Sequence, residues 1–116
     1  MDIEEYRDAI AEAAVLKRSE LHTTLRCLNY FAPHLAPIIQ TAIDSGGIER
    51  PPEVKSRDEF IHHQVSCTAD QAGEIYEALM EAETHFLGPD YESTAESARF
   101  GEVGKKWFEI SERLDQ

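Results

Sequence analysis

The stretch LHTTLRCLNYFAPHLAPIIQTAI, residues 21–43, decides the fold. It contains no Asp or Glu, and Arg26 carries its only formal charge. Its apolar residues recur every three or four positions, which is the spacing of one helical face, until Pro33 interrupts the first helix. Pro37 suits the first turn of a second helix, because proline is tolerated where the backbone N–H needs no partner. The stretch therefore predicts two apolar helices joined by a short turn.

Outward from this stretch, the helical spacing continues in both directions. Upstream it reaches Ile3, either as one long helix or as two helices with a break near Ser19. Downstream, Gly46 and Gly47 should end the second helix, since glycine reaches the left-handed conformation of a C-terminal cap. No segment alternates polar and apolar residues with period two, so no sheet is predicted.

Three potential capping boxes mark helix starts further along the chain. In such a box, the first and fourth side chains satisfy free backbone N–H groups at the start of a helix. The box Ser56–Glu59 predicts a helix that runs to the stop signal Gly88–Pro89. A second box, Thr68–Gln71, would divide that helix in two. The third, Ser93–Glu96, predicts a last helix with an irregular first part, because two glycines lie inside it.

Length and composition indicate one domain, residues 1–116, in which 41% of the residues are hydrophobic. We predict an all-α fold, a compact bundle of four or five helices. A homodimer is expected, because a stretch with one charge must be covered on more than one side. The two cysteines, Cys27 and Cys67, are predicted to be free thiols. With no long apolar run and an acidic N-terminus without a secretory signal, we expect a cytoplasmic protein without membrane contact.

The charge balance is strongly acidic, with 23 Asp and Glu against 11 Lys and Arg and a net charge of −12. Such a charge argues against direct binding to nucleic acid, which requires Lys and Arg to neutralise phosphate. It suits a basic protein partner, including a DNA-binding protein. Four acidic residues at helical spacing predict one anionic face. They are Asp70, Glu74, Glu77 and Glu81.

We expect the low-charge stretch to carry a protein–protein contact. Tyr30 and Phe31 are adjacent, so they point to different faces of one helix and cannot easily both enter the same core. Aromatic and aliphatic side chains in a desolvated centre dominate the energy of interfaces. The anionic face would then form a rim around that centre. The predicted protein-binding residues are Leu28, Tyr30, Phe31, Leu35, Ile38, Ile39 and Ile43.

Motifs for catalysis are weak. The chain has no Gly-rich phosphate loop, nucleophile elbow or cysteine pair at metal-ligand spacing, so we predict no enzymatic activity, cofactor or metal. Glu59 and His62 match the E-x-x-H spacing of di-iron bundles, but those sites need a second such motif. Arg57, followed by His62 or His63, resembles the R-x(4–6)-H element of HEPN-type ribonucleases. That resemblance covers this element alone and implies a helical dimeric ribonuclease as the alternative function, although a net charge of −12 would repel RNA.

The leading hypothesis is a small acidic intracellular protein that inhibits or sequesters another protein. Anti-activators of transcription factors, immunity proteins, antitoxins and acidic DNA-mimic inhibitors share this profile of small size, helical fold and acidity. The likeness is one of class and names no family.

Overall fold

The computed structural model describes all 116 residues. Its α-helices are α1 (Ile3–Ile10), α2 (Arg18–Phe31), α3 (Ala36–Asp44), α4 (Ala69–His85) and α5 (Ala95–Leu114). Three short 3-10 turns are η1 (Pro33–Leu35), η2 (Asp58–Phe60) and η3 (Pro89–Tyr91). Strand β1 (Val15–Lys17) pairs antiparallel with β2 (His62–Gln64). The helical prediction is confirmed in outline, and the prediction of no sheet is wrong.

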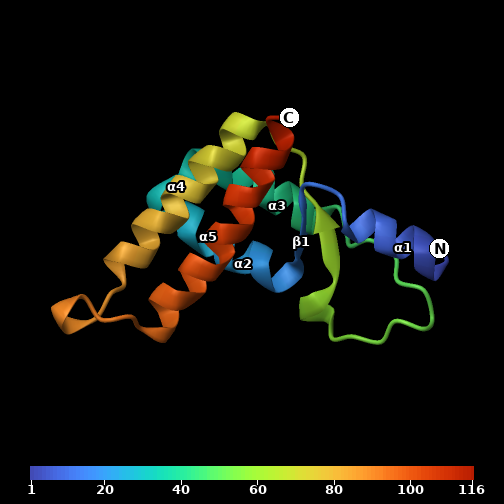
Figure 1. The fold of residues 1–116 in the computed structure, drawn as a ribbon, viewed down its shortest axis with the longest axis horizontal. Helices are drawn as coiled ribbons and strands as arrows, with labels where there is room; N and C mark the ends of the chain where they lie inside the picture. Colours follow the sequence, from blue (N-terminus) through green and yellow to red (C-terminus); the bar gives the residue numbers. More distant parts are fainter.

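The molecule has two parts, which differ in how they are built (Figure 1). Helices α4 and α5 form a long antiparallel hairpin, α2 packs against both of them, and α3 packs against α2; we call these four helices the bundle. Helix α1, the β1–β2 pair and the loop 46–61 lie at the opposite end from the tip of the hairpin, and we call them the arm. The whole chain measures 49 × 28 × 24 Å. None of the helices has both the length and the apolarity that crossing a bilayer demands.

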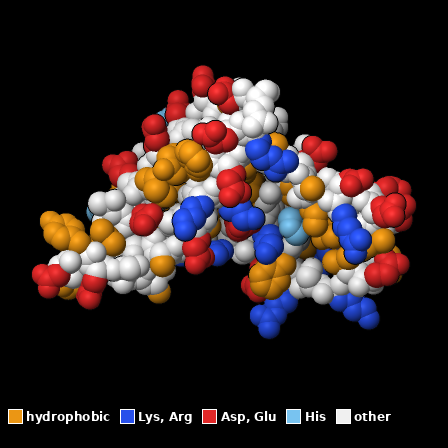
Figure 2. All heavy atoms as spheres, in the orientation of Figure 1, with side chains coloured by type: hydrophobic (Ala, Val, Ile, Leu, Met, Phe, Trp, Pro, Cys, Tyr) orange, Lys and Arg blue, Asp and Glu red, His pale blue; other side chains and the backbone are white.

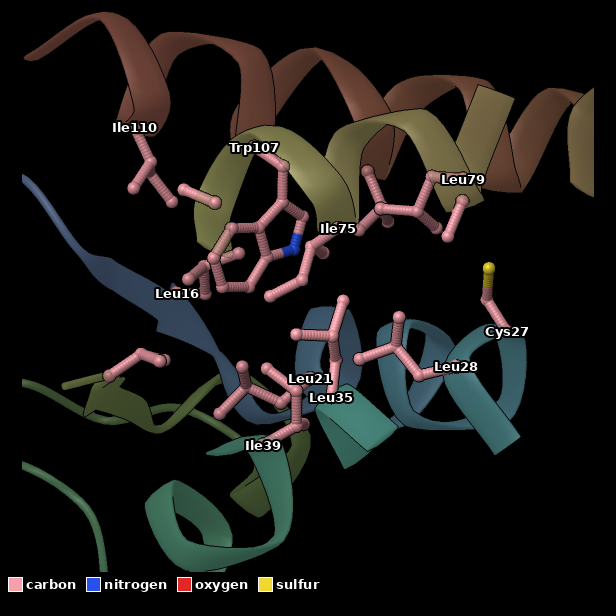
Figure 3. Packing of buried hydrophobic residues seen from close by; sticks show 14 of the residues in the cluster. Leu16, Leu21, Cys27, Leu28, Leu35, Ile39, Ile75, Leu79, Trp107 and Ile110 are labelled. Carbon is pink, nitrogen blue, oxygen red and sulfur yellow. The ribbon is translucent and has the colours of Figure 1, made fainter. Parts of the chain in front are cut away.

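The core lies between the α4–α5 hairpin and the layer formed by α2, α3 and β1 (Figure 3). Trp107 of α5 is completely buried there, and its indole N–H donates to the Thr24 hydroxyl of α2 over 3.0 Å. That bond matters because an indole N–H buried without a partner costs free energy. The largest buried apolar side chains around it are Leu16, Leu21, Leu28, Ile39, Ile75, Leu79, Phe100 and Val103.

Helix α5 is continuous from Ala95 to Leu114, so the expected irregular first part is wrong. A side chain at Gly104 would collide with Met80 of α4, and one at Gly101 would lie 2.7 Å from the Glu83 carboxylate. The two glycines therefore let α5 approach α4 closely. The packing gained across the hairpin offsets their weak helix propensity, which is a common way for tertiary context to override local preference.

The helical region predicted from Ile3 onward is divided into two helices, which agrees with the alternative of a break before the low-charge stretch. Helix α1 ends at Ile10, and α2 starts at Arg18 after the short strand β1. Asp2 caps α1, because its carboxylate accepts from the Glu5 N–H over 2.8 Å, and that bond lowers the pKa of Asp2. Tyr6 is the only residue of α1 that is buried.

The segment before α4 is not helical, so the helix predicted from Ser56 is wrong. The Ser56 hydroxyl accepts from the Arg50 guanidinium over 2.8 Å instead of capping a helix. The box at Thr68 is the one that forms: Thr68 accepts from the Gln71 N–H over 3.1 Å, and Gln71 accepts from the Thr68 N–H over 2.9 Å. Helix α4 consequently begins at Ala69.

The stop of the second apolar helix is confirmed. Helix α3 ends at Asp44, and Gly46 adopts a φ of +82°, which side-chain-bearing residues rarely adopt. Gly47 lies directly against Ile61, leaving no room for a side chain. Both cysteines are free thiols, as predicted, although Cys67 lies in the loop before α4 and not in a helix.

Candidate protein-binding surface

The low-charge stretch divides into core residues and surface residues. Leu28, Leu35 and Ile39 are 0%, 4% and 0% exposed and belong to the core (Figure 3). Ile38 and Ile43 of α3 are half-buried and pack against that core. In this fold the core explains most of the missing charge, since α4 and α5 cover α2, and α2 and β2 cover α3.

Tyr30 is the exception, because 72% of it is exposed at the end of α2. Its ring lies 4.8 Å from the half-buried ring of Phe31 and 5.9 Å from the imidazole of His85 on α4, measured between ring centroids. Phe31 and His85 are themselves 5.6 Å apart. We call Tyr30, Phe31 and His85 the Tyr30 cluster. Tyr30 and Phe31 differ in exposure, although their rings contact each other and belong to one surface.

The base beneath this cluster is held by further aromatic and polar contacts. The ring of Phe86 contacts the imidazole of His85 and stacks on the ring of Phe100 in α5, with 5.5 Å between the centres of the two phenylalanine rings. The guanidinium of Arg26 lies 5.1 Å from the centre of the Phe100 ring and 3.6 Å from the carboxylate of Glu96. The cluster therefore stands on three helices, α2, α4 and α5, that contact one another.

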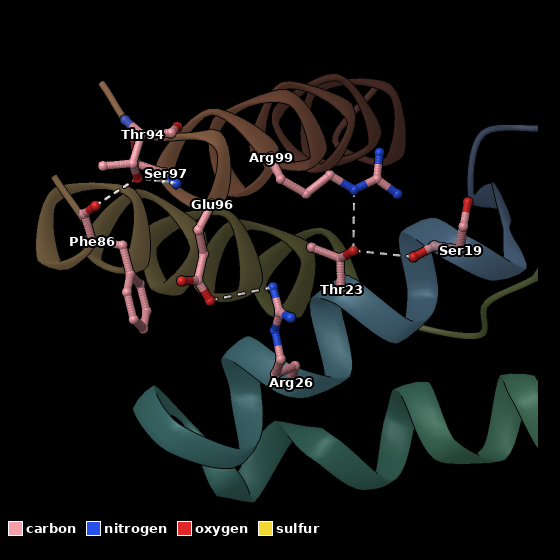
Figure 4. Close-up of polar contacts among 8 residues, drawn as sticks. All are labelled: Ser19, Thr23, Arg26, Phe86, Thr94, Glu96, Ser97 and Arg99. Carbon is pink, nitrogen blue, oxygen red and sulfur yellow. Dashed lines mark hydrogen bonds and ion pairs between the residues drawn. The ribbon is translucent and has the colours of Figure 1, made fainter. Parts of the chain in front are cut away.

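Figure 4 shows how the same three helices are tied together by hydrogen bonds. The Thr94 hydroxyl donates to the Phe86 carbonyl over 2.7 Å, joining the start of α5 to the end of α4. The Arg99 guanidinium donates to the Thr23 hydroxyl over 3.3 Å, joining α5 to α2. Thr23 in turn donates to the Ser19 carbonyl over 3.1 Å. Such cross-links position the Tyr30 cluster on a supported base.

The predicted anionic face exists as one row along α4, and we call it the acidic row. All four of its residues are exposed. Glu74 lies 3.4 Å from the imidazole of His34 in η1, so the row borders the turn that follows α2. The row ends one helical turn before His85, so it leads to the Tyr30 cluster. Its members are Asp70, Glu74, Glu77 and Glu81.

Arg57 and His63 of the ribonuclease-like element do not share one surface. Arg57 is exposed and pairs with Glu59 over 3.5 Å. His63 is completely buried; its Nδ1 donates to the Ala42 carbonyl over 3.0 Å, and its Nε2 accepts from Arg18 over 3.0 Å. An arginine can only donate, so these two bonds define the neutral tautomer of the ring.

His62 and the two cysteines show no arrangement typical of a reactive site. Burial, with a smaller effect from Lys17, lowers the pKa of His62 below its ordinary value. Burial raises the pKa of the Cys27 thiol to about 12 and also raises that of Cys67, so neither thiol is activated. No three His, Cys, Asp or Glu side chains gather closely enough to hold a metal ion.

One surface feature was missed by reasoning from the sequence. An open groove of about 690 Å³ lies between α4 and α5, with Tyr76, Met80 and Phe108 among its apolar residues. The only signal in the sequence was the pair Gly101 and Gly104, which brings the two helices together.

Comparison with known proteins gives no match to a family model, to a curated protein or to a solved structure.

Proposed function

We propose that this chain binds another protein through the Tyr30 cluster and thereby inhibits or sequesters it. The observation that carries the proposal is the 72% exposure of Tyr30 on a base of packed aromatic rings. A large ring that already rests on its neighbours loses little conformational freedom when a partner covers it. Tyrosines in such positions are enriched among the residues that dominate binding energy.

The acidic row supports a partner that presents Lys and Arg near its own binding surface. Four exposed carboxylates that lead to an aromatic centre would steer such a partner and speed its association at low salt. A basic, DNA-binding protein has this chemistry. The chain would then act as an anti-activator, an immunity protein, an antitoxin or a mimic of nucleic acid.

The test compares Tyr30→Ala with Tyr91→Ala. Tyr91 is 85% exposed at the tip of the hairpin. It is therefore a matched control, an exposed tyrosine that does not belong to the Tyr30 cluster. A partner captured from native lysate and then purified should lose about 2 kcal/mol of binding free energy to Tyr30→Ala, roughly thirty-fold in Kd. Binding to Tyr91→Ala should be unchanged, and the circular dichroism of both variants should match that of the natural chain.

Two results would overturn the proposal. If Tyr30→Ala loses its helical signal, the ring serves the fold and not a partner. If Tyr30→Ala binds normally while Glu74→Lys with Glu77→Lys abolishes binding, recognition depends on charge, and mimicry of nucleic acid replaces the aromatic contact. Under our proposal, the charge reversals mainly slow association at low salt.

The homodimer belongs to the same proposal, because a second copy is another way to cover exposed aromatic rings. Sedimentation equilibrium at micromolar concentration should give a mass above the 13.1 kDa of one chain. A mass of one chain would contradict the dimer and leave the proposed partner contact to be tested by the tyrosine variants.

A further inference from the structure

The groove between α4 and α5 is a second surface, separate from the Tyr30 cluster. Figure 2 shows hydrophobic side chains gathered over the α4–α5 hairpin and bordered by charged ones. Phe108 is 47% exposed, and its ring lies 5.2 Å from that of Tyr76 across the two helices. Met80 and Ala98 extend the apolar lining. A hollow with a cluster of apolar side chains, one of them an exposed aromatic ring, is a feature of interaction sites on small chains.

The groove and the acidic row lie on different sides of α4. Tyr76, Met80 and Glu83 line the groove on the side that faces α5. On the other side, Glu74 reaches His34 of η1. A ligand in the groove and a partner on the Tyr30 cluster would therefore contact different faces.

The charges at the edges of the groove limit what can occupy it. Three carboxylates, those of Glu83, Glu102 and Glu109, line it together with one ammonium group, that of Lys105. Two copies of the groove placed face to face would bring carboxylates against carboxylates, which costs free energy in an interface. A positively charged occupant would instead meet opposite charge on both helices.

From this lining we infer that the groove binds an amphipathic helical segment of another protein, with apolar side chains in the hollow and Lys or Arg along its flanks. A groove between two helices that lie side by side can bind a third helix, which contacts it through apolar residues spaced at i, i+3, i+4 and i+7. The acidic edges would select basic helices over acidic ones. The chain would then join two partners, one on each side of α4.

The probe for this inference is a synthetic peptide of about 15 residues, long enough to form a helix when bound, built from Leu and Lys at amphipathic spacing. A scrambled peptide of the same composition has the same charge but no apolar face. A third peptide carries Glu in place of Lys. Only the first should bind in fluorescence anisotropy and shift the NMR signals of Tyr76, Met80 and Phe108.

Matched variants separate the groove from general charge and from the Tyr30 cluster. Phe108→Ala should weaken peptide binding at least ten-fold, while Phe60→Ala, a change of a similarly exposed phenylalanine in the arm, should leave it unchanged. Glu102→Lys should weaken binding more than Glu77→Lys, although both change the net charge equally. Tyr30→Ala should leave peptide binding intact, so the failure of either proposal does not decide the other.

Four outcomes would overturn the inference. The first is no shift of the groove signals at about 1 mM peptide, a concentration that detects even weak binding. The second is equal binding of the scrambled peptide, and the third is equal loss from Glu102→Lys and Glu77→Lys; either would show attraction by charge alone. The fourth is dissociation of a dimer by Phe108→Ala without any peptide binding, which would assign the groove to a second copy. If Phe108→Ala lowers the stability of the fold, the comparison of Glu102→Lys with Glu77→Lys still tests whether the peptide binds in the groove.

Discussion

The bundle and the arm are stabilised by different kinds of contact. In the bundle, large apolar side chains surround Trp107, and their attraction depends on volume more than on direction. In the arm, His63 of β2 bonds Arg18 of α2 and Ala42 of α3 and so attaches the arm to the bundle. The ring of Tyr6 meets that of His62 edge-on. Hydrogen bonds of this kind require particular partners at particular angles. The comparison indicates that the bundle should resist single changes at its surface, while the arm depends on a few polar residues.

The largest effect is expected from emptying the centre of the bundle. Trp107→Ala removes the largest fully buried side chain and leaves the Thr24 hydroxyl without its indole partner. The free energy of unfolding should fall by about 3–5 kcal/mol, which is typical of such a cavity. Urea unfolding followed by circular dichroism measures it, with Phe60→Ala in the arm as the control. A loss below about 1 kcal/mol would mean that the bundle does not depend on this core.

A smaller and local effect is expected from the arm. His63→Ala leaves the Arg18 guanidinium and the Ala42 carbonyl unpaired, at a cost of about 1–3 kcal/mol. Amide hydrogen exchange should accelerate in β1 and β2 while α4 and α5 keep their protection. The exposed His22 provides the control as His22→Ala. Equal acceleration in α4 and α5 would show that arm and bundle open together and would break the comparison.

The start of α4 defines where the arm gives way to the bundle. Thr68→Ala removes the side-chain cap that the structure uses and should cost about 1 kcal/mol. Ser56→Ala removes the matching residue of the box that does not form, and it should cost clearly less. Thermal unfolding of the two variants side by side measures the difference. An equal loss in both would argue for a helix that starts before residue 69.

The smallest effect concerns pH and the arm. Burial lowers the pKa of His62, so the unfolded chain binds a proton at this residue more readily than the folded chain. Above the ordinary pKa of 6.5 the ring is neutral in both states, and the folded state keeps its full stability. As the pH falls below that value, the unfolded chain binds the proton first, and the free energy of unfolding decreases. His62→Gln should therefore flatten the loss of stability between about pH 7 and pH 5. Parallel profiles for the two proteins would contradict this assignment.

Much of the bundle could be predicted because its signals agree with one another. Pro37 and Gly46 mark the ends of α3, and the Thr68–Gln71 box marks the start of α4. Where contacts between distant parts of the chain determine the local structure, the prediction from the sequence was wrong. Ile61 and Val65 are four residues apart, which fits a helical face and also one face of a strand. The burial of His63 between them, with Gln64 exposed, shows that the strand period applies.

The candidate surfaces were predictable to different extents. Tyr30 next to Phe31 within one helix gave a local signal, because two adjacent aromatic residues of a helix cannot easily both enter the same core. Leu28, Leu35 and Ile39 carried the same apolar signal and proved to be core, since periodicity alone does not say what covers a face. The groove depends on how α4 and α5 align against each other. No local pattern in the sequence contains that register.

The burial of Trp107 has a practical consequence for anyone who follows this chain in solution. It is the only tryptophan, and its indole ring is shielded from water within the bundle. Its fluorescence is thus a built-in reporter of the core: emission should shift to longer wavelength when water reaches the ring, either because the bundle unfolds or because Leu16 of β1 leaves its place beside the ring. Recorded beside an arm-specific signal, one natural chromophore can show whether the two parts melt in one step or in two.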